Sequence, residues 1–283
     1  IYDKTIPSLV TPIYGLTGRG PQPAILAAMH PVLLHVGPLT LRWYGVMMGL
    51  ALILSVPITA HFAGRYGIDR RLIVDTFAVP FLAVALVGAR FGYVLSHLQE
   101  FQDRPLAAIL PPYAGLASHG SIAAGLLFLA WWCPRHRIPI WRLLDAMTPA
   151  FLVAIILVRW GNVMNGELFG DPTSLPWGIT VPGVPGGPRH PLPLYEMVGT
   201  ALILIWALRR AGRRPFDGFL FWAAVVASSV LRCFLDLLRS EDRTVIVLTW
   251  GQIAALVLIG WGVWFLWTGT RRARTVPAPG PSE

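Results

Sequence analysis

Long apolar segments, each ended by charged or turn-forming residues, follow one another along most of this chain. Seven of them have about 16 to 25 residues, which is the length that a helix needs to cross the hydrocarbon core of a bilayer. They lie at residues 39–60, 72–95, 119–134, 143–160, 194–208, 216–238 and 245–269, and the third and fifth are short. This pattern predicts an all-α polytopic membrane protein with seven transmembrane helices.

The composition agrees with a chain that lies almost wholly in a bilayer. Hydrophobic residues make up 55% of the 283 residues and charged residues only 13%, and the mean hydropathy is +0.60. Soluble domains have roughly twice that share of charged residues. We expect no soluble domain, and we expect the two long connections 96–118 and 161–193, rich in proline and glycine, to form irregular external lids.

The arginines orient the chain in the membrane. All basic residues except Lys4 are arginines, and thirteen of them fall in connections on one side of the predicted spans: Arg65, Arg70, Arg71, Arg135, Arg137, Arg142, Arg209, Arg210, Arg213, Arg214, Arg271, Arg272 and Arg274. The other side has six basic residues: Lys4, Arg19, Arg104, Arg189, Arg239 and Arg243. Because short cytoplasmic loops carry the excess of positive charge, the N-terminus is predicted outside and the C-terminus in the cytoplasm.

The net charge of +9 does not indicate a nucleic-acid partner. Its basic residues lie in short loops beside membrane spans and do not form a basic face on a soluble domain. Attraction to anionic lipid headgroups and the setting of topology account for this charge.

Polar residues gather in the outer half of the predicted spans. They come from six different spans: Arg42, Tyr44, Arg90, Tyr93, His119, Arg159, Glu196, Arg232 and Asp236. Four arginines with only two carboxylates leave an excess of positive charge at membrane depth, where charge is costly and most often functional. The excess predicts an anionic ligand, and phosphate suits a guanidinium fork. The alternative for any single arginine, Arg42 above all, is that it snorkels or binds carbonyls at a helix end.

The densest polar cluster is the segment RWGNVMNGELFG at 159–170, at the outer end of the fourth span. It contains Arg159, Asn162, Asn165 and Glu167. A charged and amide-rich cluster at that depth is expensive to desolvate, so we expect it to bind a polar ligand.

Three aspartates occupy the inner half. Asp75, Asp145 and Asp217 each fall near the first turn of a span that starts in the cytoplasm, where the helix dipole favours a negative group. We assign them no catalytic role.

His119 opens the third predicted span between small residues, in YAGLASHGSIAAG. A histidine at a helix start is most often a capping or interface residue. If His119 faces several arginines, however, their charge favours the neutral imidazole, which can accept a proton.

The two cysteines predict no disulfide and no metal site. Cys133 is expected at the inner end of the third span and Cys233 in the outer half of the sixth, so the membrane separates them. Neither has a neighbour at metal-ligand spacing, and both are expected to be buried apolar thiols. We expect no cofactor.

Six collinear motifs give the chain its resemblance to the prolipoprotein diacylglyceryl transferases, bacterial inner-membrane enzymes. The motifs are HPVLLHVGPLTLRWYGVMMG at 30–49, GARFGYVL at 88–95, SHGSIAAG at 118–125, LLDAMTPAFLVAIILVRWGNVMNGELFG at 143–170, RHPLPLYE at 189–196 and RCFLDLLR at 232–239. The resemblance runs from about residue 29 to 260.

The resemblance implies transfer of a diacylglyceryl group from phosphatidylglycerol to the lipobox cysteine thiol of preprolipoproteins. The products would be a thioether-linked precursor and glycerol phosphate. The implied partners are phosphatidylglycerol, the signal peptides of preprolipoproteins and membrane lipids, and the implied location is the bacterial inner membrane. The implied domains are an external arm at 1–38, a catalytic seven-helix domain at 39–270 and a disordered cytoplasmic tail at 271–283.

The resemblance also implies roles for individual residues. His119 would accept the thiol proton or position the thiolate, and Arg159 and Arg232 would stabilise the phosphate leaving group. The residues implied to bind substrate or to orient these arginines are Tyr44, Asn162, Asn165, Glu167, Glu196, Asp236 and Arg239.

The chain departs from the family pattern at five positions: Ser121 and Val158 replace glycines, Leu192 and Pro193 replace Ser-Gln, and Asp236 replaces glutamate. Each motif keeps its principal charged group. The alternative interpretation is therefore a diverged membrane protein that binds or carries an anionic phospholipid without catalysis.

Overall fold

The computed structural model describes residues 29–37, 39–102, 105–108, 115–239 and 249–275. The strands are β1 (Val32–Val36) and β2 (Leu39–Arg42), and the short helices are α2 (Arg70–Leu72), the π-helix η2 (Ile73–Ala78), α4 (Leu98–Phe101) and the 3-10 helix η3 (Pro105–Ala108). The long helices are α1 (Trp43–Arg65), α3 (Val79–Ser96), α5 (Ser118–Arg135), α6 (Ile140–Asn165), α7 (Leu192–Arg210), α8 (Phe219–Asp236) and α9 (Trp250–Thr275).

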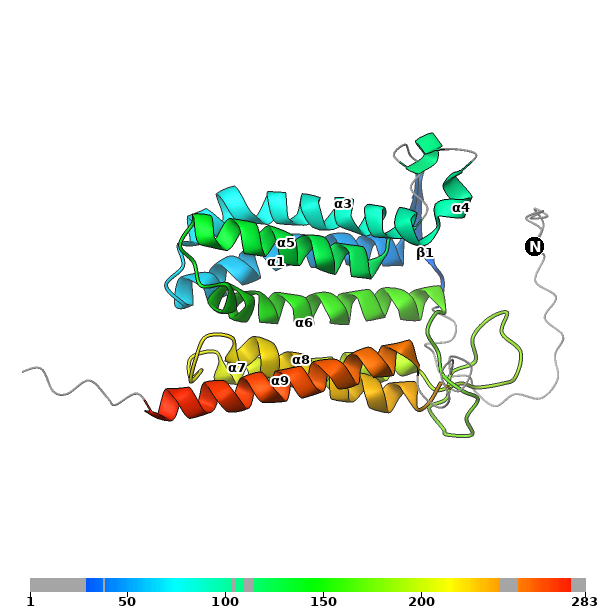
Figure 1. The fold of residues 1–283 in the computed structure, drawn as a ribbon. Coiled ribbons are helices and arrows are strands. Elements are labelled where there is room, and N and C mark those ends of the chain that lie inside the picture. Colours follow the sequence, from blue (N-terminus) through cyan, green and yellow to red (C-terminus); the bar gives the residue numbers. More distant parts are fainter. Residues whose placement is uncertain (1–28, 38, 103–104, 109–114, 240–248, 276–283) are drawn as a thin grey trace, which may run out of the picture.

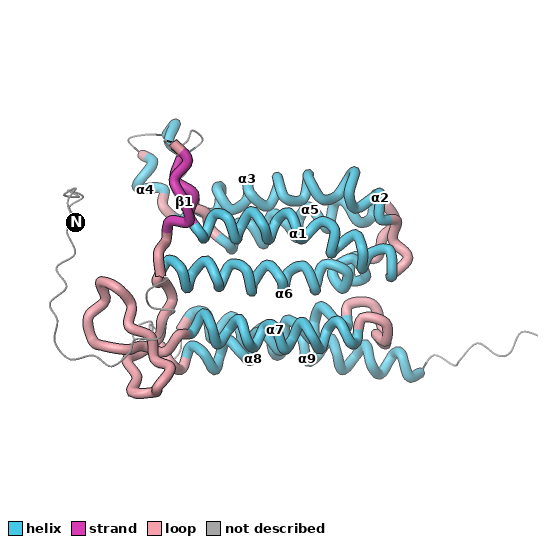
Figure 2. The backbone as a smooth tube through the Cα atoms, turned by 180° about the vertical axis from the view of Figure 1, so that it is seen from behind, coloured by secondary structure: helices cyan, strands magenta, loops and turns pink. Residues whose placement is uncertain are grey.

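The long helices lie side by side in two groups, with α6 between them (Figure 1). In the first group α1 packs along α6, and α3 packs along α5. In the second group α8 packs along α9 and contacts α7. The contact between α6 and α7 links the two groups. The β1–β2 hairpin and the long connection after α6 lie at the same end of the helices (Figure 2). We call this the hairpin end and the opposite one the arginine-rich end, because all thirteen arginines predicted on one side of the membrane lie there.

Among the described residues, six helical segments are long and apolar enough to cross a membrane: 43–65, 70–96, 140–165, 192–210, 219–236 and 251–274. They coincide with six of the seven predicted spans, so the prediction of an all-α polytopic membrane protein is confirmed. The remaining predicted span, the third at 119–134, is α5, an 18-residue helix that packs along α3. It is not among the six, because polar and small residues such as His119 and Gly120 lower its hydropathy.

At the hairpin end, the predicted boundaries of the first and fourth spans are wrong. The first span begins at Trp43 and not at 39, because residues 32–42 form an antiparallel hairpin with Val32 opposite Arg42. The fourth span continues to Asn165 and not to 160, where Gly166 ends it in the left-handed conformation with φ +70°. Asn162 and Asn165 therefore project from the last turn of a regular helix. The predicted external arm at 1–38 lies largely outside the described residues, as does most of the predicted tail.

Aromatic side chains pack together between the helices of the first group, toward its arginine-rich end. Phe77 stacks on Phe81 at 5.0 Å between ring centroids and meets Trp132 edge-on at 4.9 Å, while Phe128 lies 5.9 Å from Phe77. Phe77 comes from the π-helical segment η2, whose wider turn interrupts an otherwise α-helical span. These rings join η2 and α3 to α5 and form part of the main apolar core.

The two helix groups are joined at the arginine-rich end by Asp145, which is completely buried. Its carboxylate accepts hydrogen bonds from the backbone N–H of Gly218 at 2.8 Å and Phe221 at 2.9 Å, and it pairs with Arg214 at 3.0 Å. Gly218 precedes α8, so Asp145 on α6 compensates the positive end of α8. The interpretation of Asp145 as a residue that serves the start of its own helix was therefore wrong.

Arg214 extends this cluster toward the membrane surface. It pairs with Asp217 at 3.0 Å, and Asp217 also binds Arg142 at 3.0 Å. The guanidinium of Arg214 lies over the Tyr66 ring, 3.7 Å from its centroid. Burial raises the pKa of Tyr66 from its ordinary value of 10 to about 12, so its hydroxyl stays neutral even at alkaline pH and the cluster gains no further negative charge there.

We predict that Asp145→Ala lowers the melting temperature of the detergent-solubilised protein by roughly 6 to 12 °C. The estimate follows from about 3 kcal/mol for removing one partner of a buried pair and about 2 to 4 °C per kcal/mol in a chain of this size. Asp75→Ala is the control, because Asp75 is exposed. Equal melting temperatures for the two variants would contradict a structural role for Asp145.

Candidate functional site

Arg159 and Glu196 join α6 to α7 at the hairpin end. The Nη2 atom of Arg159 donates a hydrogen bond to Oε1 of Glu196 at 2.9 Å, and its Nε atom lies 2.7 Å from Oε2. The Nε hydrogen is not aligned on that oxygen, so charge rather than a directed hydrogen bond holds this second contact. Both side chains are less than one-fifth exposed, which strengthens their attraction compared with a surface pair.

The last turn of α6 orients Arg159 from the other side. Asn162 accepts a hydrogen bond from Nη1 of Arg159 at 3.0 Å, and its amide nitrogen donates to Glu167 at 3.1 Å. Asn165 also donates to Glu167, at 3.2 Å. Glu167 can reach back to both amides because the chain reverses at Gly166, which has a positive φ. The four polar residues of the signature segment thus form one hydrogen-bond network.

A second ion pair lies at the end of α8. Arg232 contacts Asp236 through Nε at 3.0 Å, one helical turn apart. Asp236 is buried and also accepts a hydrogen bond of 3.4 Å from the Thr249 hydroxyl.

Sequence reasoning missed Thr249. Its hydroxyl accepts a hydrogen bond from the backbone of Gln252, and the Gln252 side chain accepts one from the backbone of Thr249, each at 3.0 Å. This reciprocal pair is a capping box at the start of α9, and the pattern Thr-x-x-Gln at 249–252 was available in the sequence. It shows that α9 starts near residue 250, whereas the seventh span was predicted to start at 245.

The two ion pairs face one small cleft between α6, α7 and α8. Its lining residues are Arg159, Leu168, Leu192, Pro193, Glu196, Arg232, Leu235, Asp236 and Arg239. Arg239 donates a hydrogen bond to the carbonyl of Leu168 at 3.0 Å and so ties the end of α8 to the connection after α6. Three arginines and two carboxylates line the cleft, which leaves it with a net positive charge.

His119 lies in the other helix group, on the first turn of α5. Its Nε2 atom is 3.2 Å from the Ser96 hydroxyl at the end of α3. The backbones meet closely there, because a Cβ atom at Gly120 would lie only 2.8 Å from Cα of Gly92. Within the described residues, no hydrogen bond or ion pair links His119 to Arg159 or Arg232, so the imidazole and the arginine cleft are separate parts of the hairpin end.

Arg90 does not belong to the cleft. Its guanidinium donates hydrogen bonds to the carbonyls of Ala107, Ala108 and Gly115 at 2.6, 2.9 and 3.2 Å. It therefore organises the connection after α3, which is the alternative that the sequence left open for single arginines. Arg42 is exposed at the end of β2, directly before α1.

Tyr44 lies against the signature segment through Gly161. A Cβ atom at Gly161 would lie 3.0 Å from Cα of Tyr44 and 3.1 Å from its ring, so a larger residue there would have to push α1 and α6 slightly apart. The contact places Tyr44 beside the helical turn that carries Arg159 and Asn162.

The departures from the family pattern occupy different surroundings. Leu192 and Pro193 are buried and line the cleft directly. Ser121 lines a separate apolar cavity between α1, α3, α5 and α6. Val158 is half-buried within α6. The carboxylate of Asp236 still reaches Arg232 although it is shorter than the usual glutamate.

The connection between α6 and α7 is more ordered than the irregular lid that we predicted. Arg189 exchanges backbone hydrogen bonds with Ile179 at 2.8 and 2.9 Å. Trp177 donates to the Tyr195 hydroxyl at 2.7 Å, and His190 lies 3.4 Å from the same hydroxyl. Tyr195 directly precedes Glu196, so this network holds the first turn of α7 in place. The separation in sequence gave no indication of these contacts.

Comparison with known proteins places the chain in a family. The family model described as prolipoprotein diacylglyceryl transferase matches residues 31–268. A phosphatidylglycerol–prolipoprotein diacylglyceryl transferase of Synechococcus elongatus is 32% identical over 246 residues, which cover 82% of this chain and 85% of the relative. The enzymes of the same name from Thermus thermophilus and Geobacter sulfurreducens are 32% and 34% identical, covering 80% and 75% of this chain and 94% and 83% of the relatives.

The matched region contains every residue of the cleft, together with His119 and Tyr44. With a match over most of its length, the chain belongs to the prolipoprotein diacylglyceryl transferase family.

Proposed function

We propose that this protein transfers the diacylglyceryl group of phosphatidylglycerol to the lipobox cysteine of preprolipoproteins in the bacterial inner membrane. The observation that carries the proposal is the cleft of net positive charge around Arg159 and Arg232, at the ends of membrane-spanning helices. The charge of this cleft suits the phosphate of a lipid headgroup that binds at its mouth. The names of the relatives supply the two substrates.

The arginine-rich end is the cytoplasmic end in this proposal, because short cytoplasmic loops carry the excess of arginine. The hairpin end, with the cleft and His119, then faces outward. A lipid of the outer leaflet and a signal peptide that has crossed the membrane would both reach it.

Arg159 is suited to bind phosphate because its orientation is set before the ligand arrives. Glu196 engages Nη2 and Asn162 engages Nη1. Each of these nitrogens has a second N–H group, and two N–H groups can bind two phosphate oxygens together. A donor that is already oriented needs no rearrangement as charge develops on the leaving group.

The reaction starts at the substrate thiol, whose reference pKa of about 8.5 means that it must lose a proton to attack. His119 accepts that proton. The thiolate attacks the terminal glycerol carbon of the diacylglyceryl group, the C–O bond to phosphate breaks, and the thioether forms. Glycerol phosphate departs with the electron pair of that bond, and Arg159 and Arg232 stabilise its negative charge.

The remaining site residues position these groups. Glu196 and Asn162 hold Arg159, Asp236 holds Arg232, and Arg239 completes the positive lining of the cleft. Tyr44, Asn165 and Glu167 present hydroxyl, amide and carboxylate groups that match the hydroxyls of a glycerol headgroup. Because His119 lies in the other helix group, the two substrates must bridge the distance between the imidazole and the cleft.

The direct test incubates purified protein with phosphatidylglycerol vesicles and a lipobox peptide, and follows the diacylglyceryl thioether by mass spectrometry. We expect product with the cysteine peptide and none with the same peptide carrying serine. Absence of product, under conditions where a relative is active, would reject the enzymatic function. Retained binding of phosphatidylglycerol in that case would support the lipid-binding alternative.

We expect Arg159→Ala and Arg232→Ala each to reduce turnover about 100-fold or more, the usual loss when one preorganised charge contact is removed. Arg159→Lys should recover little of the rate, because an ammonium cannot replace a planar fork held by Glu196. The control is Arg213→Ala, which removes an exposed arginine at the opposite end. Turnover at the wild-type level in either cleft variant would contradict stabilisation of the leaving group.

For His119→Gln we expect low turnover at pH 7 and partial recovery above about pH 8.5, where the thiol ionises without a base. The comparison is the ratio of variant to wild-type rate across pH. His97→Gln is the matched control, because His97 is nearby and exposed and contacts the carbonyl of Tyr93. A ratio that does not change with pH would refute His119 as the proton acceptor.

A further inference from the structure

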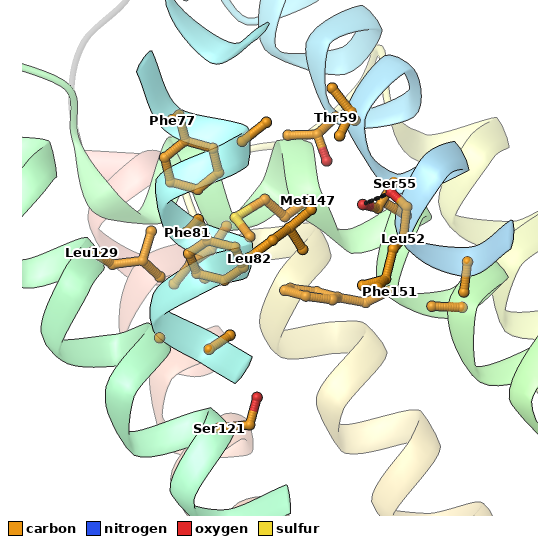
Figure 3. Close-up of a pocket in the computed structure, with 18 of the residues that line it drawn as sticks. Leu52, Ser55, Thr59, Phe77, Phe81, Leu82, Ser121, Leu129, Met147 and Phe151 are labelled. Carbon is orange, nitrogen blue, oxygen red and sulfur yellow. Dashed lines mark hydrogen bonds between the residues drawn. The ribbon is translucent and has the colours of Figure 1, made fainter. Parts of the chain in front are cut away.

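An apolar cavity of about 390 Å³ lies between α1, α3, α5 and α6 (Figure 3). Its lining includes Leu52 and Ser55 of α1, Phe77 of η2, Ser121 of α5 and Phe151 of α6. Carbon forms almost all of its surface. The Ser55 hydroxyl donates to the carbonyl of Leu52 in its own helix, at 2.7 Å, so it adds little polarity.

The cavity follows from the way the helices pair. α1 packs along α6 and α3 along α5, whereas the two pairs have few contacts with each other except near η2. The aromatic cluster of Phe77, Phe81, Phe128 and Trp132 fills the space toward the arginine-rich end. A wedge is left between the pairs and narrows toward that cluster.

Along the helices, the wedge begins at the level of the proposed site. Met48 is one helical turn from Tyr44, Ser121 is two residues from His119, and Ala154 is five residues before Arg159. Along α6 the lining runs from Ala154 to Leu144, which at 1.5 Å per residue corresponds to about 15 Å. This length is about half of a hydrocarbon core of roughly 30 Å, the depth of one leaflet.

The cavity is also open sideways to the surrounding lipid. Leu52, Ile122, Leu126 and Phe151 line it and are 40% to 63% exposed. A chain can therefore enter from the bilayer without passing through water. The cavity therefore suits an apolar, elongated group that is about as long as one leaflet is deep. The acyl chain of a phospholipid has these properties, and its headgroup would then lie at the level of Tyr44.

We propose that this cavity holds one acyl chain of the donor lipid and that Phe77, at its closed end, limits the chain length that the protein accepts. The proposal rests on the proposed function, since it concerns the lipid donor of that reaction. Phe77 is 3% exposed and is held by Phe81 and Trp132, so its ring cannot easily move aside.

Selection of this kind is steric. A chain that leaves the bilayer is already surrounded by hydrocarbon, so entering an apolar cavity releases little free energy per methylene. A chain too long for the cavity must instead distort packed side chains, and interiors resist this. A chain that is too long then leaves the headgroup farther out along the membrane normal. The distance between its phosphate and the arginine cleft increases as a result.

The test uses Ser55→Leu to shorten the cavity and Phe77→Leu to lengthen it. Ser55 lies about 10 Å along α1 from Met48 at the helical rise, so a leucine there would block the inner part. Phe91→Leu is the matched control for Phe77→Leu: Phe91 is on α3, 62% exposed and not in the cavity lining.

Vesicles contain equal amounts of phosphatidylglycerols with two identical chains, graded in length from short to long, and the thioether products are weighed by mass spectrometry. We expect Ser55→Leu to lower the ratio of longest-chain to shortest-chain product about tenfold, within the range for overpacking a filled space. Phe77→Leu should raise the ratio, and Phe91→Leu should leave it at the wild-type value. Active variants with wild-type ratios at both positions would overturn the proposal.

The lipids that remain bound to each purified variant, measured by native mass spectrometry, separate this proposal from the proposed function. Wild-type protein that forms no product from any chain length contradicts the enzymatic function alone. In that case a bound-lipid distribution that shifts with Ser55→Leu and Phe77→Leu still supports the cavity as the acyl-chain site. An unchanged distribution in both variants rejects it.

Discussion

The ion pair between Arg159 and Glu196 is the contact on which the arrangement of the hairpin end depends. A charged group near the end of a membrane helix is stable only with a partner, and this pair supplies one across two helices. It brings the last turn of α6, with Asn162, against the first turn of α7. The ordered connection from Gly166 to Tyr195 then closes around the pair, and the cleft that includes Arg232 forms beside it.

α6 has a charged anchor at each of its ends, and the two anchors differ in their chemistry. Asp145 is completely buried and accepts hydrogen bonds from two backbone N–H groups and Arg214, so it holds α8 and is not accessible to a ligand. The Arg159 end has more positive than negative charge and donors to spare. The same rule, that charge in a membrane must be compensated, therefore produces a structural joint at one end and a candidate anion site at the other.

The apolar cavity connects this site to the bilayer. Its walls come from two helix pairs that meet chiefly at η2, and glycines let α3 approach α5 closely beside His119. A lipid with its headgroup near the arginines and one chain in the wedge would be oriented at both ends. The position of the acyl chain in the cavity would then determine the position of the phosphate relative to the arginines.

Much of the fold could be predicted from the sequence, because a bilayer imposes a helix length and a charge asymmetry that appear directly in the residue pattern. Six spans, the arginine-rich side and the signature cluster were found in this way. Boundaries were less predictable: the hairpin before Trp43 is apolar enough to resemble a span, and the capping box at Thr249 was overlooked. α5 was predicted as a span, but its mixture of apolar, small and polar residues gives it a lower hydropathy than the six other helices.

The sequence by itself determined that arginines and carboxylates of this chain occur within or beside its apolar spans, and that the polar residues of RWGNVMNGELFG lie close together, because few residues separate them along the chain. Only the tertiary structure decided which arginine serves which purpose. Arg90 and Arg159 have similar settings along the chain, yet carbonyls from the connection after α3 surround the first and Glu196 holds the second. The physical reason is that the partner of a buried charge is set by segments far away in sequence, which come together only when the helices pack.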